Sequence, residues 1–226
     1  MMNRKLAFAH AVAVGALAVS FGTGAPAADL PRRLPPPVVV PVSPWTGFYV
    51  GAHVGGVTSS ETLDFAGNTD PSGALGGLQA GYNWQIAPFW VAGIEGDFSW
   101  TNANGSIPAA QFTSNHNWYS TFDGRLGYTM APGWLVYGKG GVAWMNADYN
   151  MIGTASVNDT RTGWNVGIGA EYLIAPQWTV KAEYNYLDFG KDAIGAFGGL
   201  GVDTQVNQFK LGVNYHFMPG TLFGRW

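Results

Sequence analysis

Apolar and polar residues alternate with a period of two along eight segments of this chain. In the last segment, Phe209 and Leu211 have one parity, whereas Lys210 and His216 have the other. This is the period of a β-strand, in which successive side chains point to opposite faces. The pattern therefore predicts an all-β chain of eight strands. The segments span residues 46–57, 75–84, 90–100, 118–128, 134–144, 163–172, 178–187 and 206–217.

The charged residues of these segments all lie on the polar face, and the other face is apolar and rich in aromatic residues. They form a candidate charge network of nine residues: Glu95, Asp97, Asp123, Arg125, Lys139, Glu171, Lys181, Glu183 and Lys210. Only 11% of the whole chain is charged, whereas soluble globular proteins average about a quarter. Much of the surface is therefore predicted to face something other than water.

A membrane can hide such a surface. A membrane helix needs ~18 to 20 continuous apolar residues, and no run beyond the N-terminus approaches that length. A closed β-barrel is the other structure that can span a bilayer. A soluble barrel with its apolar face inward is the alternative. Glycines on the polar face, such as Gly81, Gly141 and Gly212, favour a crowded interior on that side instead. We therefore predict an eight-stranded antiparallel up-and-down transmembrane β-barrel.

Three tight turns repeat at a fixed interval. The stretches "IAPFW", "MAPGW" and "IAPQW" place prolines at positions 88, 132 and 176, which are 44 residues apart both times. Each turn joins two predicted strands. Longer segments rich in Asn, Ser, Thr, Gly and Asp join the other pairs and are predicted to be loops: residues 58–74, 101–117, 145–162 and 188–205. Short periplasmic turns and long outer loops are typical of outer-membrane barrels.

Aromatic residues recur on the apolar face at fixed offsets from these prolines. Trp90 and Trp100 are ten residues apart, which at ~3.3 Å per residue and a tilt of ~40–45° is about 24 Å of height. That height matches the ~25 Å apolar band between the two aromatic girdles of a membrane barrel. Tryptophan suits a membrane interface because its ring is apolar and its N–H is polar. The predicted girdle residues are Trp84, Trp90, Trp100, Tyr128, Trp134, Trp144, Trp164, Tyr172 and Trp178.

The N-terminal part predicts export. Arg4 and Lys5 precede an apolar stretch and an A-x-A site that ends at Ala27, the pattern of a secretory signal peptide. We expect a signal peptide at residues 1–27, a proline-rich periplasmic tail at 28–44, the barrel at 45–217 and a C-terminal extension at 218–226. The tail is interpreted as a spacer. The alternative is a contact with peptidoglycan through Arg32 and Arg33.

The charge network must be paired if it lies inside a barrel, because unpaired buried charges cost several kcal/mol. We expect Arg125 and Lys139 to face each other across one hairpin and to take carboxylates from Glu95, Asp97 or Asp123. Glu171 and Lys181 are expected to form a cross-strand pair. Eight strands leave a lumen that side chains can fill, so the network is predicted to plug the barrel. A narrow channel is the alternative.

Motifs for chemistry are scarce. His53 and His216 lie on the first and last strands, which are neighbours in a closed barrel, so they can pair, share a ligand or simply help to fill the lumen. No motif places a Ser-His-acid or Asp-His constellation at the rim, so we expect no enzyme, cofactor or metal. Without the signal peptide the net charge changes from −3 to −5, because Arg4 and Lys5 are lost. That acidity argues against nucleic acid as a partner.

Two stretches resemble a known family. "SPWTGFYVGAHVGG" after a leader that begins "ADLP", together with "KLGVNYHF" in the last strand, is similar to the small outer-membrane surface proteins of alphaproteobacteria, the "porin family" with an opacity and OmpA-type eight-stranded barrel. The resemblance covers about residues 27 to 217. It implies an outer-membrane location, outer-membrane lipid as the surroundings, a monomer, and a structural, envelope-stabilising and surface-presenting role.

The resemblance also implies two kinds of partner. In this family the last strand is read by the barrel assembly machinery, which here points to Lys210, Gly212, Tyr215 and Phe217 as the assembly signal. The chain departs from the family by continuing past Phe217 to Trp226. Some members bind haemin, which makes haemin or small-solute binding an alternative function. Exposed His116 and Tyr149 in the loops are its candidate ligands.

Overall fold

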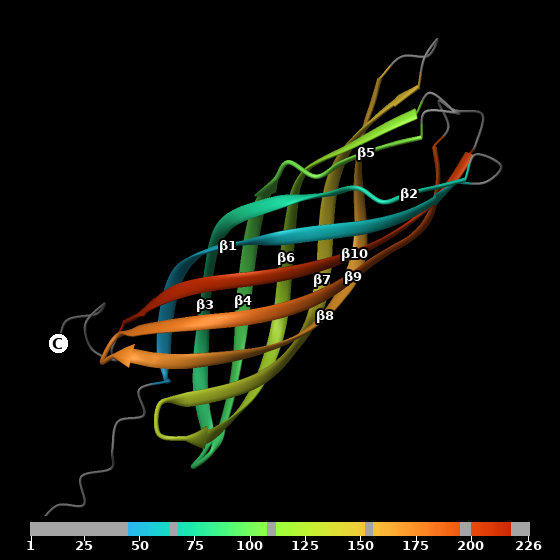
Figure 1. Cartoon of the computed structure of the whole chain (residues 1–226). Helices are drawn as coiled ribbons and strands as arrows, with labels where there is room; N and C mark the ends of the chain where they lie inside the picture. Colours follow the sequence, from blue (N-terminus) through green and yellow to red (C-terminus); the bar gives the residue numbers. More distant parts are fainter. Residues whose placement is uncertain (1–44, 64–66, 108–111, 152–155, 195–199, 218–226) are drawn as a thin grey trace, which may run out of the picture. The chain divides into compact units, whose positions relative to one another are not determined.

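The computed structural model describes residues 45–63, 67–107, 112–151, 156–194 and 200–217 (Figure 1). The predicted signal peptide at 1–27, the proline-rich tail at 28–44 and the extension at 218–226 lie outside these residues. Within them, no helix is long and apolar enough to cross a membrane.

Eight long strands form one closed antiparallel ring. Each strand pairs with the next along the chain, and the last pairs with the first, as in Tyr49↔His216 and Leu63↔Val202. The predicted all-β, eight-stranded, up-and-down barrel is confirmed. The strands of the ring are β1 (Gly47–Leu63), β3 (Ser72–Ala87), β4 (Trp90–Thr101), β6 (Phe112–Ala131), β7 (Trp134–Met151), β8 (Val157–Ala175), β9 (Trp178–Ile194) and β10 (Leu200–His216).

The strands are longer than the alternation predicted, and the expectation of four long loops is wrong. Strand β6 contains 20 residues and β8 contains 19, so most of the polar segments belong to the sheet. Two short strands, β2 (Gly67–Thr69) and β5 (Asn104–Ile107), pair at the same end. Asn, Asp, Ser and Gly have low or neutral strand propensity. Pairing with a neighbouring strand outweighs that preference here.

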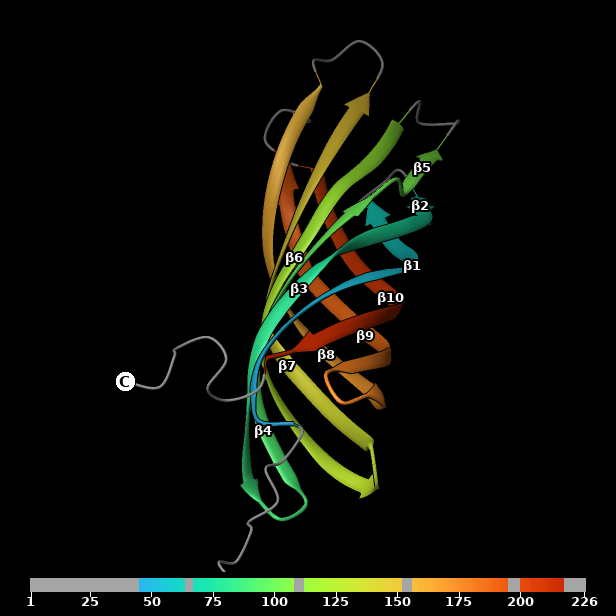
Figure 2. The ribbon, with the colours of Figure 1, turned by 90° about the vertical axis from the view of Figure 1, so that its left-hand side faces the viewer.

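Each repeated turn accepts a backbone hydrogen bond from a later strand of the ring. The carbonyl of the residue after each turn proline accepts a backbone hydrogen bond from the next hairpin: Phe89 from Thr129 (2.9 Å), Gly133 from Leu173 (2.9 Å) and Gln177 from His216 (2.7 Å). A constant interval between turns keeps these donors and acceptors in register. Gly133 has φ 80°, a conformation that glycine adopts without steric cost. Figures 1 and 2 show these tight turns at the end of the barrel opposite β2 and β5.

The outward face carries the large apolar side chains. The predicted girdle residues other than Trp144 expose between 38% (Tyr172) and 56% (Trp100) of their surface, and Trp144 is half-buried. Several pack in pairs, such as Trp134 with Tyr172 at 4.7 Å and Trp178 with Tyr215 at 5.1 Å between ring centroids. An apolar surface of this kind faces lipid in a membrane barrel. The role of these residues as interfacial anchors stays a prediction.

Candidate functional site

The lumen contains the candidate site. All nine residues of the predicted charge network are buried, with no more than 5% of any of them exposed. They come from β4, β6, β7, β8, β9 and β10, and their side chains meet across the ring. The inward parity that the sequence indicated therefore brings the network into one enclosed space.

Glycines on the inward face make room for the long charged chains. A Cβ added at Gly93 would lie 3.1 Å from Cγ of Arg125, and one added at Gly212 would lie 3.2 Å from Cγ of Lys181. Both separations are tighter than an ordinary carbon–carbon contact. The added Cβ at Gly93 would also lie 2.3 Å from Oδ1 of Asn83, and the one at Gly212 would lie 3.1 Å from the Ala52 carbonyl oxygen. Glycine at these positions is therefore explained by close packing against both the neighbouring backbone and the basic side chains.

Lys139 lies at the centre of the network. Its Nζ lies 2.8 Å from Oε1 of Glu183, 3.1 Å from Oε1 of Glu95 and 3.3 Å from Oδ2 of Asp123. Nζ of Lys181 lies 3.2 Å from Oε2 of Glu95 and 3.4 Å from Oε2 of Glu183. Two ammonium groups therefore share two glutamates. Charge-assisted hydrogen bonds of this kind are stronger than neutral ones.

Arg125 joins this centre to the end of the lumen near the tight turns. Its Nη2 donates to Oε2 of Glu171 at 2.8 Å, and its Nη1 donates to the Tyr49 hydroxyl at 3.0 Å. The guanidinium carbon lies 4.0 Å from the centroid of the Tyr137 ring, within the range of a cation–π interaction. The same two tyrosines donate to carboxylates: Tyr49 to Glu95 and Tyr137 to Glu183, both at 2.8 Å.

A second group of charges surrounds Asp97. Its Oδ1 lies 2.8 Å from Nζ of Lys210, and its Oδ2 lies 3.5 Å from Nδ1 of His53. Ser99 bridges the group, since its hydroxyl donates to Asp97 (3.0 Å) and lies 2.8 Å from Nε2 of His53. Gln79 contacts His53 and donates to Asn214, which in turn donates to Glu171. These contacts link Asp97 to the Arg125 centre, and together with the contacts of Lys139 on β7 and Lys181 on β9 they draw on all eight strands of the ring.

The predicted Glu171–Lys181 ion pair is wrong, and of the alternatives left open for His53 and His216 the structure does not show direct pairing. Glu171 and Lys181 are opposite each other in the register of β8 and β9, yet Glu171 bonds to Arg125 and Lys181 to Glu95 and Glu183. His53 and His216 lie on neighbouring strands, but His53 is opposite Gly212. His53 bonds to Gln79 and Ser99, and His216 bonds to Glu171 (3.2 Å). Neighbouring inward side chains turn towards the lumen, where opposite charges on more distant strands are closer to them.

The prediction of carboxylate partners for Arg125 and Lys139 is partly confirmed. Arg125 and Lys139 are opposite each other in β6 and β7. Lys139 contacts Glu95 and Asp123, as predicted, and also Glu183. Arg125 takes Glu171 as its nearest carboxylate, with Glu95 at 3.6 Å.

Inward aromatic residues are the part of the site that sequence reasoning missed. Tyr49 and Tyr137 are 1% and 2% exposed, and they have the same parity as the charged residues of their strands. Trp45, just before β1, is 3% exposed and packs with Val91, Leu135 and Tyr137. Its ring meets that of His216 edge-on at 6.0 Å. Parity alone identifies Tyr49 and Tyr137, but Trp45 precedes the strand and carried no such signal.

The outer half of the lumen is filled differently, by an apolar cluster. Met145 and Leu187 have no exposed surface and lie at its centre. The cluster draws on both halves of the chain and comprises Val57, Leu75, Ala103, Ile107, Tyr119, Ala143, Met145, Ala147, Tyr149, Leu187, Phe189, Val202 and Val206. It is the second feature that the sequence analysis did not predict.

One ion pair is enclosed in this apolar cluster. Nε2 of His116 lies 2.8 Å from Oε1 of Glu61, which also accepts from Ser114 (3.1 Å), and Tyr119 bonds to the other ring nitrogen of His116. Burial raises the pKa of the Tyr149 hydroxyl, which lies in the same region. His116 and Tyr149 are 2% and 0% exposed and belong to β6 and β7. The prediction that they are exposed loop ligands for haemin is therefore wrong.

Arg161 ties the outer ends of β8, β9 and β10 together. Its guanidinium donates to the Thr204 hydroxyl (2.7 Å) and to the carbonyls of Val202 (2.7 Å) and Gly190 (3.2 Å). Three elements are thus held by one buried side chain. Like the rest of the site, this arrangement binds the barrel's own groups to each other.

The side chains described in the lumen form ion pairs and hydrogen bonds with one another or pack in the apolar cluster. In the part of the chain that the structure describes, no group of three or more His, Cys, Asp or Glu residues is placed to hold a metal ion.

Comparison with known proteins finds a matching family, similar proteins and similar solved structures. The family described as "Outer membrane protein beta-barrel domain" matches residues 14–217. The "31 kDa outer-membrane immunogenic protein" of Brucella melitensis is 34% identical over 237 residues, which cover 91% of this chain and 99% of that protein. The protein of the same name in Brucella suis has the same values. The crystal structure of Neisserial surface protein A covers 76% of this chain and 98% of its own, with a TM-score of 0.51 and 16% identity, a likeness of fold alone.

Proposed function

Since this chain belongs to the outer-membrane β-barrel family, and thus lies in the bacterial outer membrane, we propose that it has a structural and surface-presenting role. In this proposal the charge network plugs the lumen, and the barrel holds its outer strand ends at the cell surface. The Brucella relative, an outer-membrane immunogenic protein, supports surface presentation. We propose that the protein has no enzymatic activity.

One observation carries the proposed plug. Every charged residue of the network has an oppositely charged partner no more than 3.3 Å away, from Lys139 with three carboxylates to Lys210 with Asp97. These short contacts span the ring from side to side, where a channel would need mobile water. The apolar cluster and the buried Trp45 support closure towards the outside and the periplasm respectively.

Planar-bilayer recording tests this proposal against a narrow channel. The wild-type protein is expected to give no stable conductance. A variant with Glu95→Gln and Glu183→Gln is expected to unfold at a lower temperature, since two shared carboxylates lose their charge, and still not to conduct. Asp148→Gln, at a half-buried outward position that is not part of the network, is the matched control. Large, stable wild-type currents would refute the plug.

The last strand supports a second part of the proposal, namely recognition by the barrel assembly machinery. Lys210 and Gly212 point inward, whereas Tyr215 and Phe217 pack together at 5.0 Å between ring centroids. Loss of outer-membrane insertion in Phe217→Ala, with Trp226→Ala unchanged, would identify Phe217 as the signal. The reverse result would assign that role to Trp226.

We propose that the barrel is a monomer in outer-membrane lipid, and that residues 28–44 form a periplasmic spacer. A peptidoglycan pull-down with Arg32→Ala and Arg33→Ala tests the alternative, in which the tail binds the cell wall.

A further inference from the structure

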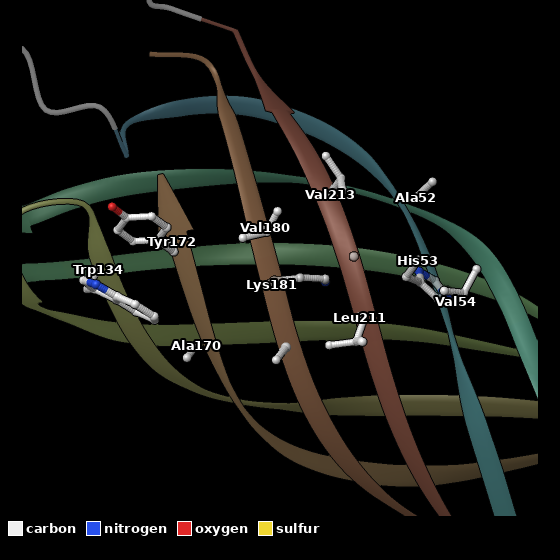
Figure 3. Close-up of a pocket in the computed structure, with 12 residues that line it drawn as sticks. Ala52, His53, Val54, Trp134, Ala170, Tyr172, Val180, Lys181, Leu211 and Val213 are labelled. Carbon is white, nitrogen blue, oxygen red and sulfur yellow. The ribbon is translucent and has the colours of Figure 1, made fainter. Parts of the chain in front are cut away.

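The outer wall of the barrel has a hollow of about 630 Å³ that crosses β8, β9, β10 and β1 (Figure 3). Its floor is formed by small side chains, notably Ala170, Ala182 and Ala52, and Trp134 and Tyr172 stand at one end. Lys181 and His53 also line it, but their side chains are fully buried in the lumen. The exposed lining is therefore apolar.

The strand register explains the hollow. Ala170 and Ala182 are opposite each other, and the flanking outward pairs are Tyr172 with Val180 and Ile168 with Tyr184. Outward side chains two residues apart along a strand are separated by ~6.6 Å. Two alanines between two rows of large side chains thus leave a trough about one side chain wide. Beyond Ala182 the floor row meets Leu211 on β10. The hollow is bounded on β10 by Leu211 and Val213, and it reaches Ala52, which belongs to the adjacent row of Val213.

The trough climbs from the periplasmic interface towards the middle of the barrel. Trp134 lies two residues after its turn proline, and Tyr172 lies four residues before the next one. In register, Tyr172 continues through Val180 and Val213 to Ala52, which lies well inside β1. Rows of paired residues run across strands that are tilted by ~35–45° in such barrels. The trough therefore starts at interface height and ends at mid-membrane height.

These features define the occupant. Because the barrel lies in the outer membrane and the lining is apolar, the occupant is hydrocarbon or another apolar protein surface. A second barrel would meet this convex wall along neighbouring strands, whereas the trough crosses four strands around the circumference. A flexible chain can follow that path.

We propose that the trough binds one acyl chain of a phospholipid from the periplasmic leaflet. The Trp134 indole N–H and the Tyr172 hydroxyl are at the same end of the hollow (Figure 3), with their rings 4.7 Å apart. At the interface these groups donate hydrogen bonds to the ester and phosphate region of the lipid. The chain then lies over Ala170 and Ala182 and ends near Ala52.

Photo-cross-linking tests the position of the chain. The probe is phosphatidylethanolamine with a diazirine in one acyl chain, in bilayers that contain the full-length mature protein. Cross-links are expected to concentrate on the peptides of β8, β9 and β10 that line the trough. Ala182→Phe fills the trough and is expected to lower this labelling about tenfold, equivalent to ~1.4 kcal/mol. Val142→Phe, on the lipid-facing side of β7 and 42% exposed, is the matched control and is expected to change nothing.

Native mass spectrometry tests the head-group end and the rival occupants. Wild-type protein titrated with phosphatidylethanolamine is expected to retain one lipid, and Tyr172→Phe with Trp134→Phe to retain it several-fold less. Ala182→Leu replaces Ala182→Phe if the larger residue prevents folding, which is checked by heat-modifiable gel mobility.

Three results would overturn the proposal. The first is labelling spread evenly around the barrel, and the second is preferential retention of lipid A. The third is efficient disulfide-linked dimers of Ala182→Cys, a clean probe because the chain has no cysteine. That result would assign the trough to a second copy.

Discussion

The periplasmic and outer halves of the lumen are enclosed by the same eight strands but filled by opposite means. The periplasmic half contains charged groups in close contact, such as Lys139 with Glu183 at 2.8 Å. The outer half contains apolar side chains such as Met145 and Leu187, with the pair Glu61–His116 among them. The first half is filled by paired charges and the second by apolar side chains.

The difference shows what each filling can specify. A buried ion pair gains little net free energy, because desolvation offsets its attraction, but removing one partner is costly. Each charge in the periplasmic half therefore has few acceptable neighbours, which selects one arrangement of the strands. An apolar cluster tolerates substitutions that keep its volume. The following substitutions test this contrast.

Lys139→Met is expected to have the largest effect, about 3–5 kcal/mol of unfolding free energy. Its removal leaves Glu95, Asp123 and Glu183 short of a positive partner. Urea unfolding in detergent micelles measures the loss. Adding Glu183→Gln to the variant should recover part of it. A loss below about 1 kcal/mol would mean that the charges of the periplasmic half are interchangeable after all.

Leu187→Ala is expected to cost about 2–4 kcal/mol through the cavity that it leaves in the outer half. The cost should be the same at low and high salt, because no charge is involved. Leu211→Ala, on the lipid-facing side and 52% exposed, should cost much less in the same unfolding measurement. Equal losses for the two variants would contradict a packed outer half.

Glu61→Gln tests whether the Glu61–His116 pair of the outer half behaves like the ion pairs of the other half. The amide keeps the shape and an acceptor for His116 but loses the charge, so we expect a loss of about 1–2 kcal/mol. NMR of the His116 imidazole should report the change in its partner, and Ser114→Ala serves as a milder control. A loss as large as that of Lys139→Met would erase the contrast between the halves.

Asp148→Asn is expected to cause the smallest loss of unfolding free energy, since this residue lies on the outside of the barrel. Hydrogen bonds from the Asn117 and Asn158 amides hold the pKa of Asp148 below its usual value. Its stabilising contribution is therefore complete above the unfolded pKa of about 3.9 and is lost as the pH falls through the lower folded pKa. The expected effect is under about 0.5 kcal/mol near neutral pH. Unfolding midpoints at neutral and acidic pH measure it, and a large neutral-pH loss would show that Asp148 is not a surface residue.

Much of the fold could be predicted because the relevant signals are local. Alternation along β10 assigned Lys210 inward and Leu211 outward, and the burial of both agrees. The strand ends could not be predicted, since the polar outer segments have weak strand propensity and are held by their neighbours. The haemin interpretation failed for the same reason: His116 was taken as a loop residue, yet it lies in β6.

The amino-acid sequence by itself determined the number of strands, the turns and the face on which each charge lies, because a period of two acts between neighbours in the chain. Only the tertiary structure decided which charges meet. Lys210 and Asp97 are 113 residues apart in sequence and 2.8 Å apart across the lumen, a distance set by closure and stagger of the ring. The same closure placed Leu187 with Met145 in the outer half and opened the trough over Ala170 and Ala182, since these depend on how separate strands align.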